Sequence, residues 1–255
     1  MIFIQKKSEP EGLRLLREEA ARRGLSPEQA YNTLRNPLKK DVLDALVKEQ
    51  GRLCAYCMCR IPRSDVPGFS QIKPITIEHV IPRNPDDNRD VGQGLDYNNL
   101  VAVCHGNRAP RSAGHTVIDL TCDAHRENAE LKKVDPCNAG TLNSIEYEID
   151  GTIKSSTDAD VNYDLDQILN LNYSQLKAER KAALDALIED MGPCLDDEKK
   201  IPLYVQTKLS SFNNESDPKT PYVGILIWYL KSFQNNASLN EDDATNAAAD
   251  QGSVT

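Results

Sequence analysis

Apolar positions in the first fifty residues follow the spacing of amphipathic helices. Two segments, EGLRLLREEAARR and LKKDVLDALVKEQ, repeat apolar residues at helical intervals, and a glycine closes each of them. Between them, Ser26 precedes Pro27, which is the composition of a capping residue followed by proline at the first helical position. Residues 1–50 are therefore predicted to form an N-terminal helical segment.

The pattern changes in residues 51–150, where short apolar runs replace the helical repeats. The runs ITIEHVIP, NNLVAVC and HTVIDLTC are separated by Pro, Gly, Asn and Asp, which is typical of short strands joined by polar loops. The next segment, DAHRENAELKK, has helical composition, and SIEYEIDGTIK predicts a hairpin with Asp150 and Gly151 at its turn. This part of the chain is predicted to combine small strands with a helix.

Helical spacing returns in residues 151–234, where YSQLKAERKAALDALIEDMG carries its leucines on one face. Residues 235–255 are acidic and rich in Ala and Asn, so we expect this tail to be disordered. The whole pattern predicts an α+β fold in which a small mixed core is flanked by N-terminal and C-terminal helices.

Charge and hydropathy limit the possible functions. The net charge is -9, and it is uneven, since residues 1–150 carry 21 Lys and Arg against 22 Asp and Glu, while residues 151–255 carry 9 against 17. A nucleic-acid-binding protein usually has a basic surplus, so the overall charge argues against that class. The apolar run VGILIWYL is much shorter than the roughly 20 residues that a bilayer requires, and MIFIQKKSEP has no signal-peptide pattern. We expect a cytoplasmic protein that makes no membrane contact.

Cysteine spacing predicts a metal site. The chain has seven cysteines, an odd number for a disulfide framework. Cys54 and Cys57 form a CxxC knuckle, which brings two thiolates to one tetrahedral ion and needs two further ligands. Cys104 and Cys122 each close an apolar run and are the candidates. These four cysteines predict a structural zinc site.

Other ligand sets remain open from the sequence. His105, His115 and Cys59 are alternative zinc ligands. The CxxC pair could also be two buried thiols without a metal.

Glu78 and His79 interrupt the apolar run ITIEHVIP shortly before Pro82. An isolated Glu-His pair is most often a salt bridge or a solvated pair at a strand end, because short motifs match by chance. A catalytic interpretation therefore depends on the rest of the chain.

The order of these motifs resembles that of the HNH nuclease family. CxxC is followed by EHxxP, by an Asn-Leu pair leading to a cysteine, and by CDxxR. The zinc-knuckle form of that family has this order on a ββα-metal fold. Most of the chain is also similar to one branch of the family, the HNH nuclease subunits of Septu and retron-associated anti-phage defence systems. The lead-in helix, the CHGN...CDAHREN insert and the segments LNLNYSQLKAERKAAL and PYVGILIWYL carry this second resemblance.

The resemblance implies a role for each matching residue. His79 would be the general base that activates water, and Glu78 would bind the catalytic divalent ion. Asn99 would hold the loop and orient the histidine. Asp123 would be the second metal ligand, and Arg126 would contact a phosphate. Mg²⁺ suits such a site, because it prefers oxygen ligands and keeps several of its waters.

The sequence departs from the family pattern at one point. The second cysteine pair is usually a tight CxxC, but here 17 residues, HGNRAPRSAGHTVIDLT, separate Cys104 from Cys122. A rival alignment would take His105 or Asn107 as the fourth zinc ligand. The insert has two arginines and two histidines against one aspartate, so it predicts a locally basic loop that could bind phosphates despite the acidic chain.

The resemblance also implies partners and a setting. It predicts a nucleic-acid substrate, DNA or RNA, a PtuA-like ATPase as partner, and in retron systems a reverse transcriptase with its RNA-linked DNA, all in the bacterial cytoplasm. Two rival classes remain. A non-catalytic zinc-knuckle module binding nucleic acid or protein needs neither Glu78 nor His79, and a zinc hydrolase of small substrates needs an open zinc position.

Overall fold

The computed structural model describes residues 1–62, 75–83, 94–107, 119–195, 197 and 199–234. Within these ranges the protein combines helices with two antiparallel sheets of two strands each, which confirms the expected mixture of helix and sheet. The tail at 235–255, expected to be disordered, lies outside the described residues. No helix in the described part of the chain has the length and apolar character needed to cross a membrane.

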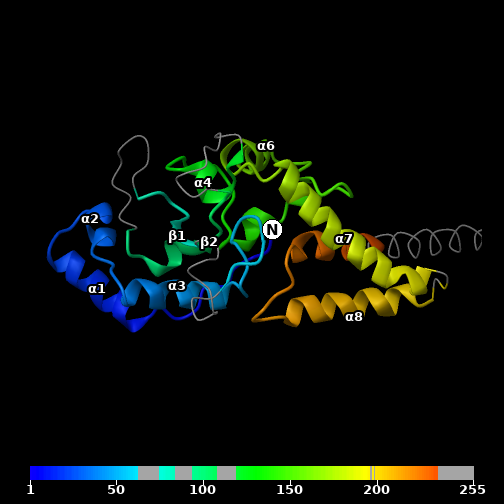
Figure 1. The fold of residues 1–255 in the computed structure, drawn as a ribbon, viewed down its shortest axis with the longest axis horizontal. Coiled ribbons are helices and arrows are strands. Elements are labelled where there is room, and N and C mark those ends of the chain that lie inside the picture. Colours follow the sequence, from blue (N-terminus) through cyan, green and yellow to red (C-terminus); the bar gives the residue numbers. More distant parts are fainter. Residues whose placement is uncertain (63–74, 84–93, 108–118, 196, 198, 235–255) are drawn as a thin grey trace, which may run out of the picture.

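The N-terminal helices form where the sequence predicts them. They are α1 (Glu11–Arg22), α2 (Pro27–Asn32) and α3 (Leu38–Glu49), at the left and lower edge of Figure 1. Ser26 caps α2 in a reciprocal capping box, because its hydroxyl accepts the Gln29 N–H while the Gln29 side chain accepts the Ser26 N–H. Gly24 ends the preceding turn with φ +62°, a conformation that favours glycine.

Two short strands form the centre of the fold. β1 (Thr76–His79) pairs antiparallel with β2 (Leu100–Val103), with Thr76 opposite Val103 and His79 opposite Leu100. All four residues of β2 are buried. α3 packs against β2, and its C-terminal neighbour Gln50 exchanges side-chain hydrogen bonds of 2.7 and 2.8 Å with the backbone of Ala102. The N-terminal helices are thus fixed to the central strands.

The helix after Cys122 is shorter than its composition predicts. α4 (Cys122–Arg126) ends where Glu127 adopts a positive φ of +52°. Beyond it, the carboxylate of Asp164 accepts the backbone N–H groups of residues 132–134, which holds this stretch in a turn. The expected strand before Cys122 is likewise not formed in its described part, residues 119–121.

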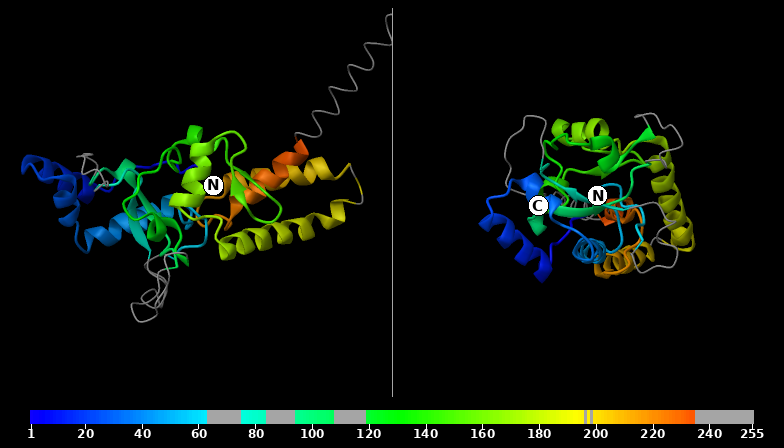
Figure 2. Two further views of the ribbon diagram at one scale, coloured as in Figure 1. Left: turned by 90° about the horizontal axis from the view of Figure 1, so that it is seen from above. Right: turned by 60° about the vertical axis from the view of Figure 1, so that its left-hand side comes forward.

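The C-terminal half has a small hairpin followed by long helices. β3 (Glu146–Tyr147) pairs with β4 (Ile153–Lys154) across a turn in which Gly151 has φ +87°, as predicted from Asp-Gly. The remaining elements are α5 (Ala139–Leu142), α6 (Ala159–Tyr163), a π-helical turn (Asp164–Ile168), α7 (Ser174–Leu195), α8 (Ile201–Asn214) and a helix over 223–234. α7 and α8 pack together as a long arm that extends away from the strands (Figures 1 and 2).

The segments on either side of residue 150 share one core. The backbone of Tyr222 donates to the Met58 carbonyl at 3.1 Å, and that of Lys219 donates to Gly51 at 2.9 Å. Arg180, on α7, is almost fully buried and donates to the Gly151 and Leu171 carbonyls. The cysteine-containing segment is therefore hydrogen-bonded to the stretch between α8 and the last helix.

Candidate active site

Four cysteines from three separate segments converge on one point. The sulfur atoms of Cys54, Cys57, Cys104 and Cys122 all lie within 4.8 Å of one another, and none of the four forms a disulfide. The Sγ–Sγ distance is 3.9 Å from Cys54 to Cys122, 3.8 Å from Cys57 to Cys104 and 3.7 Å from Cys104 to Cys122. These are the four cysteines that the spacing predicted.

The geometry of the cluster fits a tetrahedral metal ion. Four sulfurs at about 2.3 Å from a central Zn²⁺ lie about 3.8 Å from one another, close to the three distances observed. Cys54 and Cys122 are buried, and Cys57 is 1% exposed. The cluster could hold a metal ion such as zinc. Four thiolate ligands fill a tetrahedral ion, which is the arrangement of structural rather than catalytic zinc sites.

Backbone contacts explain how the long insert still delivers Cys122 to the cluster. The N–H of Thr121 donates to the Gly106 carbonyl at 3.0 Å, which ties the two ends of the insert together. Gly106 has φ +58°, and a Cβ there would lie 2.0 Å from the Thr121 oxygen. The insert is therefore closed at its base, and its length does not disturb the cysteines.

The alternative ligands occupy other places. Cys59 follows the knuckle, and its carbonyl accepts the Cys54 N–H at 3.0 Å, but its sulfur is not part of the four-cysteine group. His105 is buried beside the cluster and is likewise not part of the group. His115 and the two arginines of the predicted basic loop lie outside the described residues.

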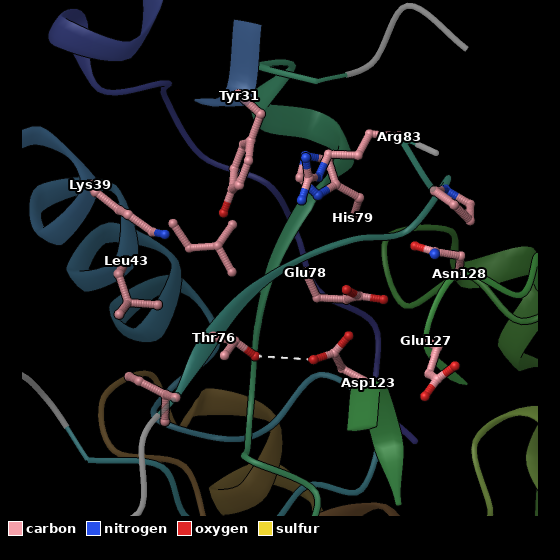
Figure 3. A pocket seen from close by; sticks show the side chains of 13 residues that line it. Tyr31, Lys39, Leu43, Thr76, Glu78, His79, Arg83, Asp123, Glu127 and Asn128 are labelled. Atoms are coloured by element: carbon pink, nitrogen blue, oxygen red, sulfur yellow. Dashed lines mark hydrogen bonds between the residues drawn. The ribbon is translucent and has the colours of Figure 1, made fainter. Parts of the chain in front are cut away.

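A cleft of about 350 Å³ is lined by β1 and by the start of α4. Glu78, His79 and Asp123 all line it, together with Glu127 and Asn128 after α4. In Figure 3 the carboxylates of Glu78 and Asp123 point toward each other, and Thr76 donates to Asp123 at 3.4 Å. The strand and the helix thus bring the predicted base and both predicted metal ligands into one cavity.

His79 is held in one tautomer by the backbone. Its Nε2 lies 3.0 Å from the Gly94 carbonyl, which can only accept, so Nε2 carries the hydrogen and Nδ1 has the lone pair. Burial lowers the pKa of His79 to about 4, outweighing the Gly94 hydrogen bond, which raises it. The imidazole is therefore neutral near pH 7, the state in which it can take a proton.

Helix α2 positions this histidine from two sides. The ring of Tyr31 meets the His79 ring edge to face, with the centroids 4.7 Å apart and the planes at 77°. Gly94 lies so close to α2 that a Cβ there would be 2.0 Å from the Pro27 oxygen. The carbonyl that holds His79 is therefore seated against the N-terminal helices.

Asn99 secures the chain just after His79. Its side chain accepts the Ile81 N–H at 2.7 Å and donates to the Ile81 carbonyl at 2.9 Å, while its own carbonyl accepts the Val80 N–H. The amide thus holds the loop in the way expected. The described bonds fix His79 through its backbone neighbours.

The pKa of Glu78 is raised in the cleft, mainly by burial. Burial raises the pKa of Glu78 to about 8 in the absence of an ion, and the charge of Asp123 adds to the rise, while Arg126 opposes it. Two acidic groups that repel each other in a buried site favour a bound cation, since a divalent ion stabilises their charged forms.

Arg126 takes a different role from the predicted phosphate contact. Its side chain is fully buried and donates to Glu78 at 2.6 Å, to the Tyr56 hydroxyl at 2.8 Å and to the carbonyls of residues 79, 80 and 129. With these bonds made inside the protein, the guanidinium ties α4 to the end of β1. It is a positioning residue for Glu78.

Three cleft residues escaped the sequence reasoning. Tyr31 and Lys39 come from the N-terminal helices and Arg83 from the loop after β1. Arg83 directly follows the EHxxP motif, and this position is the only sequence signal that could have suggested any of the three.

A comparison of the chain with protein-family models and with curated proteins found no match.

Proposed function

We propose that the protein is a metal-dependent endonuclease of the HNH type that hydrolyses phosphodiester bonds, with DNA as the favoured substrate and RNA as the other possibility. One observation carries this proposal: Glu78, His79 and Asp123 line one cleft although they come from different elements. The antiparallel pair β1–β2, the helix α4 and the four-cysteine group support the proposal, since a ββα-metal core with a zinc knuckle would contain such elements.

The residues of the cleft suit this chemistry. Glu78 and Asp123 would hold a divalent ion such as Mg²⁺, which when bound stabilises the charge on the leaving oxygen. Neutral His79 would take a proton at Nδ1 from the attacking water, whose oxygen bonds to phosphorus as the leaving P–O bond breaks. Gly94 and Tyr31 keep the imidazole oriented.

Zinc at the four cysteines would have a structural role. It would join the knuckle, the end of β2 and the start of α4, and so fix the strand and helix that carry the catalytic side chains. This supports the nuclease over a zinc hydrolase, because four thiolates leave no position for a substrate. The alternative of a non-catalytic binding module leaves the Glu78, His79 and Asp123 cleft without a purpose.

The wider setting follows from the resemblance to PtuB, the HNH subunit of Septu and retron-associated systems. We propose that the C-terminal residues 151–234, with the projecting α7–α8 arm, dock a PtuA-like ATPase (Figure 1). The acidic balance of this half supports an electrostatic contribution to docking. A reverse transcriptase with its RNA-linked DNA would complete the assembly in a retron system.

A cleavage assay tests the proposed activity. Full-length protein is incubated with labelled duplex DNA, single-stranded DNA and RNA, with and without Mg²⁺, and with and without the ATPase. We expect endonucleolytic products that require a divalent ion. Absence of cleavage in every combination, with zinc bound and the protein folded, would favour the binding module instead.

A further inference from the structure

One wall of the cleft is basic and aromatic, and it is formed by two N-terminal helices and the segment after β1. Tyr31 of α2, Lys39 of α3 and Arg83 after β1 line it, and Figure 3 shows them on the side away from Asp123 and Glu127. Tyr31 lies between the two cations: its ring centroid is 4.6 Å from the Arg83 Cζ and 5.6 Å from the Lys39 Nζ. The aromatic ring thus keeps both positive charges at the cleft.

Arg83 has hydrogen-bonding capacity that the described residues do not use. Its Nη1 atom is buried, and it has no hydrogen-bond partner in the described part of the chain. A buried polar group without a partner is costly, and more so when it is charged. Arg83 also lines the cleft, so its guanidinium lies beside the position that an anionic oxygen bound there would occupy.

Lys39, on α3, provides the second positive charge at the cleft. It is exposed on the first turn of α3, so a ligand entering from solvent can reach its ammonium. Figure 3 shows the amine directed toward the middle of the cleft rather than away from it. A forked guanidinium and a mobile ammonium are the usual pair of groups that bind phosphate.

We infer that Lys39 and Arg83 bind backbone phosphate of the nucleic acid in the cleft, the task that the sequence had suggested for Arg126. This inference rests on the proposed nuclease function. It also addresses the acidic composition, since two cations placed beside the catalytic groups provide local affinity on a chain of net charge -9. The N-terminal helices are then part of the substrate site.

Binding measurements over a range of salt test the assignment. Affinity for a fluorescent DNA duplex is measured with Mg²⁺ present and in the His79→Ala background, in which we expect cleavage to be at least about 10²-fold slower. Lys39→Gln and Arg83→Gln are compared with Lys40→Gln and Arg35→Gln, which remove neighbouring exposed cations that do not line the cleft. Zinc content and thermal unfolding confirm that every variant is folded.

Each lost phosphate contact has a defined signature. The slope of log K against log salt should fall by about 0.9 for duplex DNA, which at physiological salt corresponds to roughly fivefold weaker binding per contact. We expect this for Lys39→Gln and Arg83→Gln and no change for the two controls. If the wild-type enzyme cleaves while the cleft variants behave as the controls do, the assignment is wrong and the nuclease stands. If the wild type neither binds nor cleaves nucleic acid, both proposals fail.

Discussion

Arg126 on α4 donates to the Glu78 carboxylate on β1 at 2.6 Å, and the guanidinium side chain has no exposed surface. Removal of one partner of a buried ion pair is strongly destabilising, because the other charge is then left alone in the interior. Here the pair also fixes the orientation of a proposed metal ligand. The strand and the helix of the cleft are therefore coupled through one guanidinium.

Substitution of Arg126 should therefore lower the stability of the protein rather than merely weaken substrate binding. Arg126→Ala leaves Glu78 buried without its partner, which typically costs about 3–5 kcal/mol. The Arg126→Lys variant keeps the charge but lacks the fork that reaches several acceptors, so it should recover only part of the stability. Chemical denaturation gives the free energy of unfolding for both variants.

The control for this prediction is Arg22→Ala on α1. Arg22 pairs with Glu19 at 2.7 Å on the surface, where its side chain is 74% exposed. A surface pair contributes roughly 0–1 kcal/mol, so the control should unfold almost as the wild type does. Equal stability of the Arg126→Ala and Arg22→Ala variants would contradict the positioning role and restore the phosphate contact.

Zinc content should depend on Cys122 and not on Cys59. Cys122→Ser removes one sulfur of the four-cysteine group, whereas Cys59→Ser removes a sulfur outside it. Metal binding at structural zinc sites supplies on the order of 10 kcal/mol, as much as the entire stability of many domains. We expect the Cys122 variant to purify poorly and without zinc, and the Cys59 variant to be folded and loaded.

Elemental analysis of both variants measures this directly. Chelation of the wild type should likewise lower its unfolding temperature. Full zinc loading of a folded Cys122→Ser protein would show that another side chain is the fourth ligand.

Gly94→Ala should slow catalysis without loss of zinc. The added Cβ would lie 2.0 Å from a backbone oxygen of Pro27, so either the loop or α2 must move. Because the Gly94 carbonyl holds His79, that movement displaces the base, and an error of about 1 Å can cost on the order of 10²-fold in rate.

Gly192→Ala is the matched control. Gly192 lies on α7, and a Cβ there meets no atom within 4 Å. Alanine would meet no neighbouring atom there, and although the following Pro193 restricts its backbone, the site is remote from the cleft, so this variant should be as active as the wild type. Single-turnover cleavage rates compare the two. An unchanged rate for Gly94→Ala would mean that the Gly94 contact does not set the histidine orientation.

Local patterns predicted the parts of the fold that depend on neighbours in sequence. The N-cap at Ser26, the Asp-Gly turn at Gly151 and the CxxC knuckle all arise from short-range chemistry, and the structure has each of them. The candidate site was predictable to the extent that its residues follow recognisable motifs. Glu78 and Asp123 meet in the cleft although many residues separate them.

Burial and packing between distant segments were not accessible in this way. Nothing near Arg126 in the sequence shows that four acceptors from distant segments surround it. The sequence also does not show that α4 ends at Glu127, or that Asp164 binds the backbone of residues 132–134. The contribution of Tyr31 to the cleft likewise comes from tertiary packing, because nothing in the sequence of α2 indicates that it packs beside β1.

The strongest test of the proposed chemistry compares His79→Ala with Glu78→Gln. His79→Ala removes proton abstraction, which typically contributes about 10²–10⁴-fold, and leaves both carboxylates in place, so the dependence on Mg²⁺ concentration should not change. Glu78→Gln keeps a hydrogen-bond acceptor for Arg126, which also donates to the Tyr56 hydroxyl and to the carbonyls of residues 79 and 80, but it removes a negative charge from both the metal site and the buried pair. Its activity should therefore be lower and should recover partly as Mg²⁺ increases, since Asp123 can still bind the ion. Neither residue belongs to the four-cysteine group, so both variants should retain zinc, which serves as the folding control. Cleavage rates are measured against Mg²⁺ concentration for the wild type and both variants. A zinc-loaded His79→Ala protein that cuts nucleic acid at the wild-type rate would exclude His79 as the base and leave Glu78 and His79 as a structural pair at the end of β1.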